Sequence, residues 1–158
     1  MMQPKVRKAT LKDLPILLEF EQGVIEAERP MDPTLKDEKI SYYDLSEFMN
    51  NDDSELLVIE LNNEVVASGY AKIKEDRPYL KHDKQGYLGF MFVPENHRGN
   101  GYNKLIVNAL LSWCKSKNVN EIRLDVYDDN PSALRAYQKA GFKNHLINMR
   151  LDINDIDF

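Results

Sequence analysis

The residues best suited to chemistry lie in one short run, Val93-Pro94-Glu95-Asn96-His97-Arg98-Gly99-Asn100-Gly101-Tyr102-Asn103. Glycines at 99 and 101 let the backbone turn so that successive N–H groups converge. A helix that begins at Gly101 adds its own unpaired N–H groups and the positive end of its dipole. Arg98 supplies a charged donor. The run therefore predicts an anion site suited to a phosphate or pyrophosphate, with an ordinary loop as the plainer alternative.

Two familiar phosphate motifs do not fit this run. A P-loop requires Gly-Lys-Ser/Thr after its spacer, and the sequence has no such triplet here. The dinucleotide fingerprint requires a third spaced glycine, which is missing, although Glu121 and Asp125 lie at a compatible distance for its acidic residue.

The elements that position the run follow from the hydrophobic period. Strands are expected at residues 6–9, 55–61, 64–74, 86–93, 121–127 and 142–153, with a tight turn at Asn62-Asn63. Helices are expected from the Thr10 cap, with Asp13 three residues on, to a stop before Pro30, and at about 39–49, 101–117 and 131–140. The order β-α-α-β-β-β-α-β-α-β predicts an α/β (α+β) fold. Its sheet is mixed, mostly antiparallel and twisted, with helices on both faces, in one domain over residues 4–158.

The composition excludes several classes of protein. Of 158 residues, 42% are hydrophobic and 30% are charged, which is typical of a soluble globular protein. The formal net charge of -5 argues against a nucleic-acid partner. The single cysteine, Cys114, favours a reducing compartment and a cytoplasmic location. No apolar run is long enough to cross a membrane, and the three histidines show no metal-ligand spacing, so neither a membrane nor a metal is expected.

Two motifs together make the pattern specific. Arg98-x-x-Gly101, directly after Val93-Pro94-Glu95, resembles the acyl-CoA signature of the GNAT superfamily of N-acetyltransferases. Further along, Asn130-x-x-Ala133-x-x-x-Tyr137-x-x-x-Gly141-Phe142 is similar to the second hallmark of that superfamily. The resemblance covers nearly the whole chain and implies a GNAT-type fold.

The resemblance also implies a site for acetyl-CoA. Strands 86–93 and 121–127 would splay apart, and the pantetheine arm would pair with the backbone of Met91, Phe92 and Val93. The pyrophosphate would lie on the N–H groups of Arg98, Gly99, Asn100, Gly101, Tyr102 and Asn103, with Asn130 touching the cofactor arm. The superfamily usually has Gly or Ala at the position of Asn103, whose side chain would either crowd the phosphate or hydrogen-bond to it.

For catalysis, the resemblance implies that the Tyr137 hydroxyl donates a proton to the thioester sulfur. Asp125 stands where the ribosomal-protein alanine acetyltransferases have a Glu base, and as the shorter residue it would work through a water. The alternatives are a core tyrosine at 137, and an Asp125 that pairs with a neighbour such as Arg123 and has no chemical role. Glu28, Asp32 and Tyr43 would bind the acceptor, the alternative being a solvated face with core aromatics.

The function expected is transfer of an acetyl group from acetyl-CoA to a primary amine, on a small molecule or a peptide, by direct attack in a ternary complex. The alternatives are an acyl-CoA sensor or regulatory module without turnover, and a transferase that uses another acyl donor. The expected partner is the amine acceptor, and the sequence leaves open whether the protein forms a homodimer.

Overall fold

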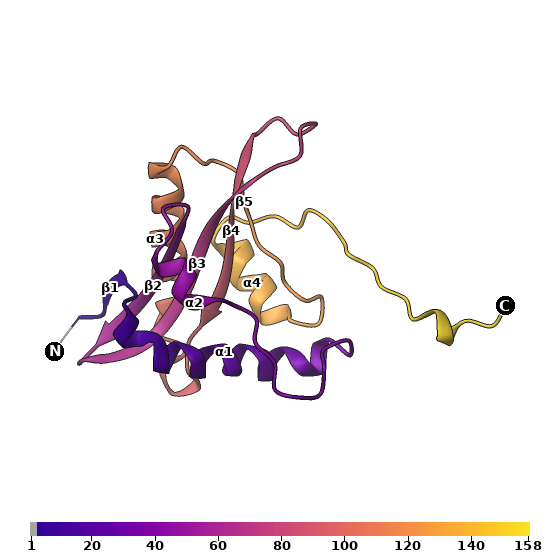
Figure 1. Cartoon of the computed structure of the whole chain (residues 1–158), viewed down its shortest axis with the longest axis horizontal. Helices are drawn as coiled ribbons and strands as arrows, with labels where there is room; N and C mark the ends of the chain where they lie inside the picture. Colours follow the sequence, from indigo (N-terminus) through magenta and orange to yellow (C-terminus); the bar gives the residue numbers. More distant parts are fainter. Residues whose placement is uncertain (1–2) are drawn as a thin grey trace.

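A five-stranded sheet forms the centre of the protein in a computed structural model that describes residues 3–158 (Figure 1). Its strands are β1 (Lys5–Lys8), β2 (Ser54–Leu61), β3 (Glu64–Glu75), β4 (Lys84–Phe92) and β5 (Ile122–Arg123). They lie in the order of the sequence. Neighbours are antiparallel except β4 and β5, which are parallel. The predicted mixed, mostly antiparallel sheet is confirmed.

Helices cover both faces of this sheet. They are α1 (Leu14–Glu28), α2 (Leu45–Met49), α3 (Tyr102–Ser116) and α4 (Pro131–Lys139), with short 3₁₀ turns at Leu11–Asp13, Arg29–Met31, Glu95–His97 and Ile153–Asp155. Leu56 and Val58 of β2 face α1 and α2, whereas Leu57 and Ile59 face α3. Because side chains of a strand alternate, a strand with both faces covered is apolar at successive positions, as β2 is from Leu56 to Ile59.

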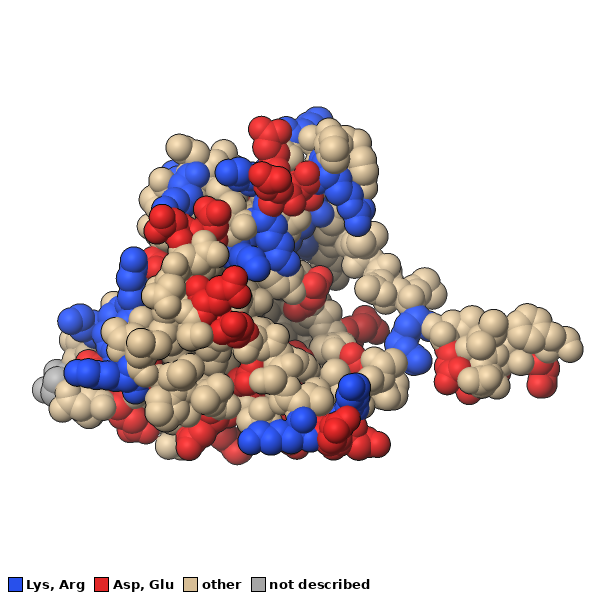
Figure 2. All heavy atoms as spheres, in the orientation of Figure 1, with Lys and Arg blue, Asp and Glu red and all other residues tan. Residues whose placement is uncertain are grey.

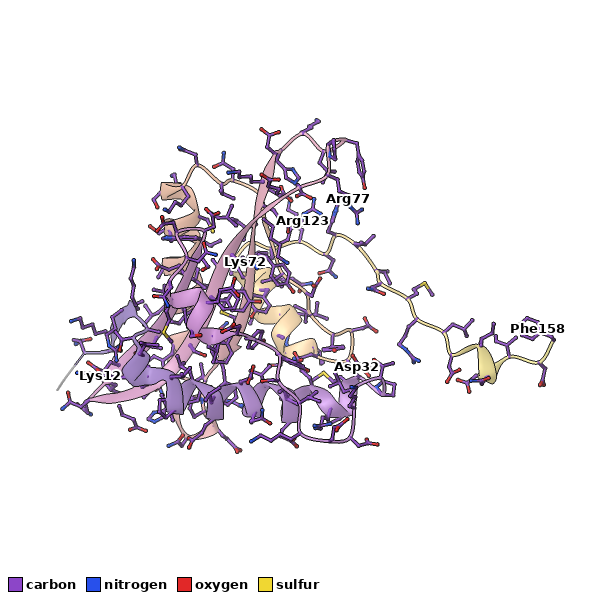
Figure 3. The ribbon with its side chains drawn as sticks, viewed as in Figure 1. Lys12, Asp32, Lys72, Arg77, Arg123 and Phe158 are labelled. Carbon is purple, nitrogen blue, oxygen red and sulfur yellow. The ribbon has the colours of Figure 1, made fainter. Side chains whose placement is uncertain are left out.

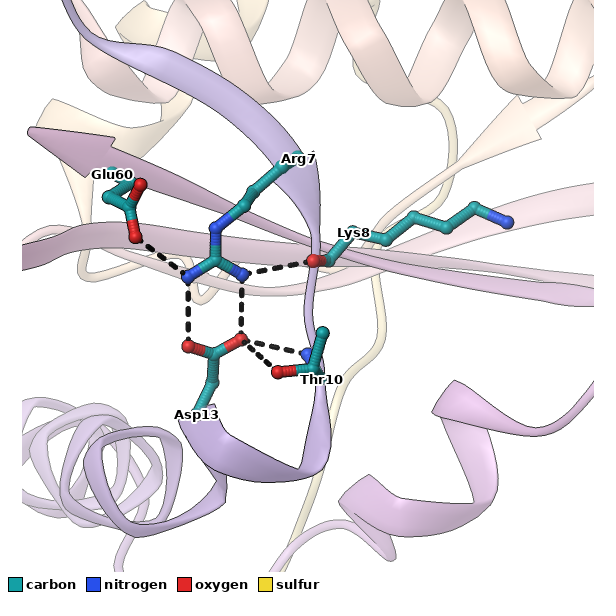
Figure 4. A network of polar contacts seen from close by, with 5 residues as sticks. All are labelled: Arg7, Lys8, Thr10, Asp13 and Glu60. Atoms are coloured by element: carbon teal, nitrogen blue, oxygen red, sulfur yellow. Dashed lines mark hydrogen bonds and ion pairs between the residues drawn. The ribbon is translucent and has the colours of Figure 1, made fainter. Parts of the chain in front are cut away.

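Local signals at two turns are confirmed. Asn62 and Asn63 join β2 to β3 with φ of 52° and 65°, the left-handed values that such a hairpin requires. Asp13 accepts from the Thr10 backbone N–H at 2.8 Å and from both terminal nitrogens of Arg7, which also bonds Glu60 at 3.2 Å (Figure 4). The Arg7 guanidinium lowers the pKa of Asp13, so this carboxylate ties β1 to the start of α1.

The second helix is shorter than the predicted 39–49, because a buried carboxylate takes the backbone donors that would begin it. Glu21 is 1% exposed and accepts from the N–H groups of Tyr42 at 2.9 Å and Tyr43 at 2.8 Å. Residues 42–43 are therefore not helical, and α2 begins only after Asp44, whose side chain accepts from the Glu47 N–H.

The strand predicted at 121–127 is also wrong in its extent. β5 pairs with β4 only at Gly86↔Ile122 and Tyr87↔Arg123. Beyond this point β4 bulges at Phe90, which has a φ of 57°, and the two chains part.

The predicted strand at 142–153 does not form. After α4 the chain runs out from the body as an extended segment and ends at a distance from the sheet (Figure 1). The sheet accordingly has five strands where six were predicted.

Candidate functional site

A turn of positive-φ glycines connects β4 to α3. Gly99 and Gly101 have φ of 84° and 77°, a region that side chains with a Cβ rarely adopt, and a Cβ at either would meet open space. Glycine is therefore required here by backbone conformation and not by crowding. The Asn100 side chain closes the turn by donating to the His97 carbonyl at 2.9 Å.

The turn delivers free donors at the start of α3. The first bond of the helix runs from the Leu105 N–H to the Gly101 carbonyl, so the N–H groups of Tyr102, Asn103 and Lys104 precede the ladder. A cavity of about 140 Å³ lies there, lined by Val93, His97, Arg98, Gly99, Gly101, Tyr102 and Asn103. Unpaired N–H groups and a helix dipole favour an anion, so the cavity has the character of a phosphate cradle.

The Arg98 side chain is partly committed within this cradle. Its Nε donates to the Val93 carbonyl at 2.9 Å, which fixes the guanidinium beside the turn and leaves its terminal nitrogens outside that bond. The same bond occupies the carbonyl of Val93, one of the residues expected to pair with a cofactor arm. Asn103 is one of the residues that line the cavity, so it would contact an anion bound there.

The bulge in β4 opens the edge of that strand. The Ser68 hydroxyl, buried in β3, donates to the Phe90 carbonyl at 3.0 Å and holds the left-handed residue in place. The Phe92 ring packs on Phe20 with centroids 5.0 Å apart, on the α1 side of the sheet. Because β5 does not follow β4 past Tyr87, the backbone at Met91 and Phe92 has no strand partner on the β5 side among the described residues.

A second group of polar side chains near β4 is a set of phenol–carboxylate pairs. Tyr42 donates to Glu28 at 2.9 Å, Tyr87 to Asp125 at 2.7 Å and Tyr127 to Asp32 at 2.6 Å. Tyr43 lies against Phe90 of β4, with ring centroids 5.0 Å apart. We call these residues the acidic tyrosine cluster; they come from the end of α1, the segments after it, β4 and the chain after β5.

The charges of the cluster act on one another. Burial, and next the charge of Asp32, raise the pKa of Glu28. Hydrogen bonds from Thr34 and then Tyr127 lower the pKa of Asp32 to about 2. Burial raises the pKa of Tyr87, and Asp125 and Glu28 raise it further, so the phenols stay protonated as donors. Figure 2 shows acidic side chains, together with lysine and arginine side chains, around a hollow on this face, and Figure 3 marks Asp32 at the end of α1.

The structure separates the predicted site residues into groups. Glu28 and Asp32 share the cluster, whereas Glu26, on the same helix as Glu28 and outside the predicted set, pairs with Arg29 at 3.1 Å. Arg123 pairs with Glu121, and the neighbour with which Asp125 pairs is Tyr87. Sequence reasoning missed Tyr87, because nothing in a β4 tyrosine signals a partner 38 residues away.

The α4 residues of the second motif have defined places. The Asn130 side chain accepts from the Ala133 N–H at 3.2 Å and caps the helix. Tyr137 packs edge-on against Phe142, with centroids 5.9 Å apart, and burial raises its pKa to about 12. Its hydroxyl is therefore a protonated donor at neutral pH.

Neither a metal-binding group nor a membrane-spanning helix is found within residues 3–158. No group of three or more His, Cys, Asp or Glu side chains in that range could hold a metal ion. None of the helices of the described chain is both long and apolar enough to cross a membrane.

Comparison with known proteins agrees with this fold. The model of the acetyltransferase (GNAT) family matches residues 22–142, from α1 through the cradle to Phe142. The chain belongs to this acetyltransferase family.

Among curated proteins, the chain is similar to human N-acetyltransferase 8B, with 30% identity over 82 residues, 52% of this chain and 36% of that one. It also resembles the uncharacterized N-acetyltransferase YobR of Bacillus subtilis, with 33% identity over 60 residues, 38% of this chain and 24% of that one. The matches thus span about a third or less of each relative.

Among solved structures, a tetramutant of the BH1408 protein from Bacillus halodurans superposes with a TM-score of 0.82 and 26% identity, covering 94% of this chain and 99% of that one. A predicted acetyltransferase from Clostridium acetobutylicum, solved with acetyl-CoA, has a TM-score of 0.74 and 20% identity, covering 99% of this chain and all of that one. The second likeness concerns the fold alone.

Proposed function

We propose that this protein transfers an acetyl group from acetyl-CoA to the primary amine of a cationic acceptor. The observation that carries the proposal is that β4 joins two chemically different sites. The phosphate cradle follows the end of β4, and the acidic tyrosine cluster contacts β4 at Tyr87 and Phe90. Tyr87 and Val93 are roughly 20 Å apart along an extended strand, so a long donor arm would connect the sites.

The donor site is assigned to the cradle and the open edge of β4. The pyrophosphate would rest on the N–H groups from Arg98 to Asn103, with Gly99, Asn100 and Gly101 forming the turn. The thiol-bearing arm would pair with backbone groups of Met91, Phe92 and Val93, and Asn130 would touch it. The acetyl-CoA bound by the Clostridium acetobutylicum protein supports this choice of donor.

The acceptor site is assigned to the acidic tyrosine cluster. Glu28, Asp32 and Tyr43 would bind the acceptor, because two carboxylates beside aromatic rings attract a cation. The raised pKa of Glu28 reflects burial and the nearby charge of Asp32. An ammonium group placed between the two would relieve that repulsion.

The reaction itself requires two proton transfers. The neutral amine nitrogen forms a bond to the thioester carbonyl carbon, and the carbon–sulfur bond breaks with its electron pair on sulfur. Tyr137 donates its proton to that sulfur, and Asp125 accepts the proton that the nitrogen loses, directly or through a water. Tyr87 holds the Asp125 carboxylate in place by its hydrogen bond.

Direct attack is favoured over a covalent enzyme intermediate. Cys114 is fully buried, and burial raises its pKa to about 11, so its thiolate does not form at neutral pH.

The test is release of free CoA, measured with a thiol-reactive dye, in the presence of amines matched in size but differing in charge. A diamine or a lysine-containing peptide should be acetylated faster than a neutral monoamine. If none of the amines supports turnover while acetyl-CoA still binds measurably, the protein would be a sensor instead. If free CoA is released faster from a longer acyl-CoA, the donor would be that acyl-CoA and not acetyl-CoA.

A further inference from the structure

Two lysines of β3 stand beside the acidic tyrosine cluster. Lys72 and Tyr87 are cross-strand partners, and Lys74 follows two residues along β3. Because side chains alternate along a strand, both lysines share the face of Tyr70, which packs with the residues of α1 and α2. The Lys74 ammonium lies 4.2 Å from the centre of the Tyr87 ring, and the hydroxyl of that ring donates to Asp125. One phenol ring therefore separates a cation from the proposed base.

Aromatic rings direct both ammonium groups. The Lys72 ammonium lies 5.9 Å from the centre of the Phe48 ring, and Phe48 stacks on Tyr70 with ring centroids 4.3 Å apart. Tyr70 in turn meets Tyr43 edge-on, with centroids 5.5 Å apart. A cation over the face of an aromatic ring is attracted to that ring. These contacts hold both lysines to the aromatic surface that leads into the acceptor site.

The charge of the two lysines is not balanced by the protein. Neither Lys72 nor Lys74 takes part in a salt bridge within residues 3–158. Asp76, two residues beyond Lys74, contacts His82 at 2.6 Å and accepts from Gln85 at 2.8 Å. Positions two apart on a strand are roughly 7 Å apart, so the two ammonium groups repel each other. An anion bound between them would relieve that repulsion.

This face of the protein therefore presents two opposite charges. Glu28 ends α1 and Asp32 follows it, whereas the two lysines lie on β3. Figure 2 shows basic as well as acidic side chains at the border of the hollow, and Figure 3 marks Lys72 and Asp32 at separate places on this face. An acceptor with an amine alone would complement only the acidic group. An acceptor that also carries an anion would complement both.

We propose that the acceptor is a small amino acid, whose amine faces the acidic tyrosine cluster and whose carboxylate binds between Lys72 and Lys74. This inference rests on the proposed acetyl transfer and names the class of acceptor. The bonds that form and break are unchanged, because the carboxylate takes no part in them. Its role is to orient the nitrogen towards Asp125, one phenol ring away from Lys74.

The experiment compares acceptors that differ only in their second group. Glycine, β-alanine and 4-aminobutyrate place the carboxylate at increasing distance from the amine, and the carboxamide of each keeps the size and removes the charge. Their binding to the full chain saturated with CoA is measured by ligand-observed NMR titration at pH 7. Their turnover is measured as free CoA released from acetyl-CoA. Binding decides this inference and turnover decides the proposed function, so the two can fail separately.

The test variant is Lys72→Gln with Lys74→Gln. The matched control is Lys84→Gln with Lys115→Gln, which removes the same charge from the opposite face of the sheet. Lys84 shares its strand face with Leu88, which packs against α3, and Lys115 belongs to α3 itself. All four lysines are exposed, so neither variant should unfold the protein.

In wild type and control, at least one of the amino acids should bind roughly three- to tenfold more tightly than its carboxamide, the scale of one or two exposed ion pairs. In the test variant this ratio should fall to about one. Lys72→Glu with Lys74→Glu should reverse the preference and bind 1,3-diaminopropane more tightly than β-alanine. Because each ratio is taken within one protein, a general loss of stability or affinity does not alter it.

Three results would overturn the inference. The first is equal binding of every amino acid and its carboxamide by the wild type. The second is a preference for the carboxylate that survives in the test variant, because the two lysines would then not be its cause. The third is an equal loss of that preference in the control, because the net charge of the protein would then set it.

Discussion

The Tyr127 hydroxyl donates a 2.6 Å hydrogen bond to Oδ2 of Asp32, across 95 positions of sequence. This bond connects the loop after α1 to the chain after β5, the two segments that border the acidic tyrosine cluster. It is one of two side-chain bonds, with that from Thr34, that favour the ionised form of Asp32.

Tyr127→Phe should raise the pKa of Asp32 above about 2, towards its ordinary value of 3.8. Because the folded-state pKa is lowered, the stabilising effect of this carboxylate is present above pH 3.8 and is lost as pH falls through about 2. In the variant that loss should begin at higher pH. Carbon-13 NMR titration of the carboxyl group measures the shift. Thr34→Val, which removes the stronger side-chain bond, should shift it further. An unmoved pKa in both variants would mean that these two hydroxyls do not set the acidity of Asp32.

Neutralising Glu28 and Asp32 together, by Glu28→Gln and Asp32→Asn, should raise the KM for a cationic amine roughly three- to tenfold and reduce its salt dependence. The physical reason is loss of attraction for the ammonium group. Glu26→Gln is the control, because Glu26 lies on the same helix but pairs with Arg29. Equal KM values in wild type, double variant and control would assign Glu28 and Asp32 to an ordinary solvated face.

Gly101→Val should weaken acetyl-CoA binding by roughly 10- to 100-fold, because a β-branched residue cannot hold a φ of 77° and the turn must shift. Calorimetric titration measures the affinity. Gly141→Val is the matched control: its φ is 107°, and it lies at the end of α4 and not in the cradle. The Gly141→Val variant should lose stability and keep its affinity for acetyl-CoA. A comparable loss of affinity in both variants would mean that backbone strain in general, and not the cradle, is responsible.

Asp125→Asn should lower kcat roughly 10²- to 10⁴-fold at pH 7, the range of a positioned base. The deficit should shrink as pH rises towards the pKa of the amine, about 10.4 for a lysine-like acceptor, because a neutral amine needs no base. Tyr87→Phe should give a smaller loss with the same pH trend, since it only frees the carboxylate. Glu121→Gln, on the same segment but bonded to Arg123, should behave as wild type. A deficit independent of pH would point to a structural role for Asp125.

Tyr137→Phe removes a hydroxyl and keeps the ring that packs on Phe142. If that hydroxyl protonates the departing sulfur, kcat falls roughly 10²- to 10⁴-fold while acetyl-CoA affinity stays the same. Melting temperature is measured on the same sample. A stable variant with full turnover would exclude Tyr137 as the acid.

Much of the fold could be predicted because its signals are local. The turn at Asn62-Asn63 and the glycines at 99 and 101 reflect backbone angles that few residue types adopt, and each is confirmed by its φ. The alternation in β2 and the helical spacing in α3 report which faces are covered, so the layers follow from sequence.

What only the tertiary structure decided are contacts between distant positions. Glu21 takes the donors of residues 42–43 and shortens α2, Ser68 holds Phe90 in a left-handed bulge, and Tyr87 takes Asp125 as its partner. None of these has a periodic or local signature, because a single hydrogen bond across a sheet imposes no pattern on the residues beside it. For residues 142–153 the alternation predicted a strand, and none forms in the described chain. Whether a strand forms depends on a second edge to pair with, which a stretch of sequence cannot specify by itself.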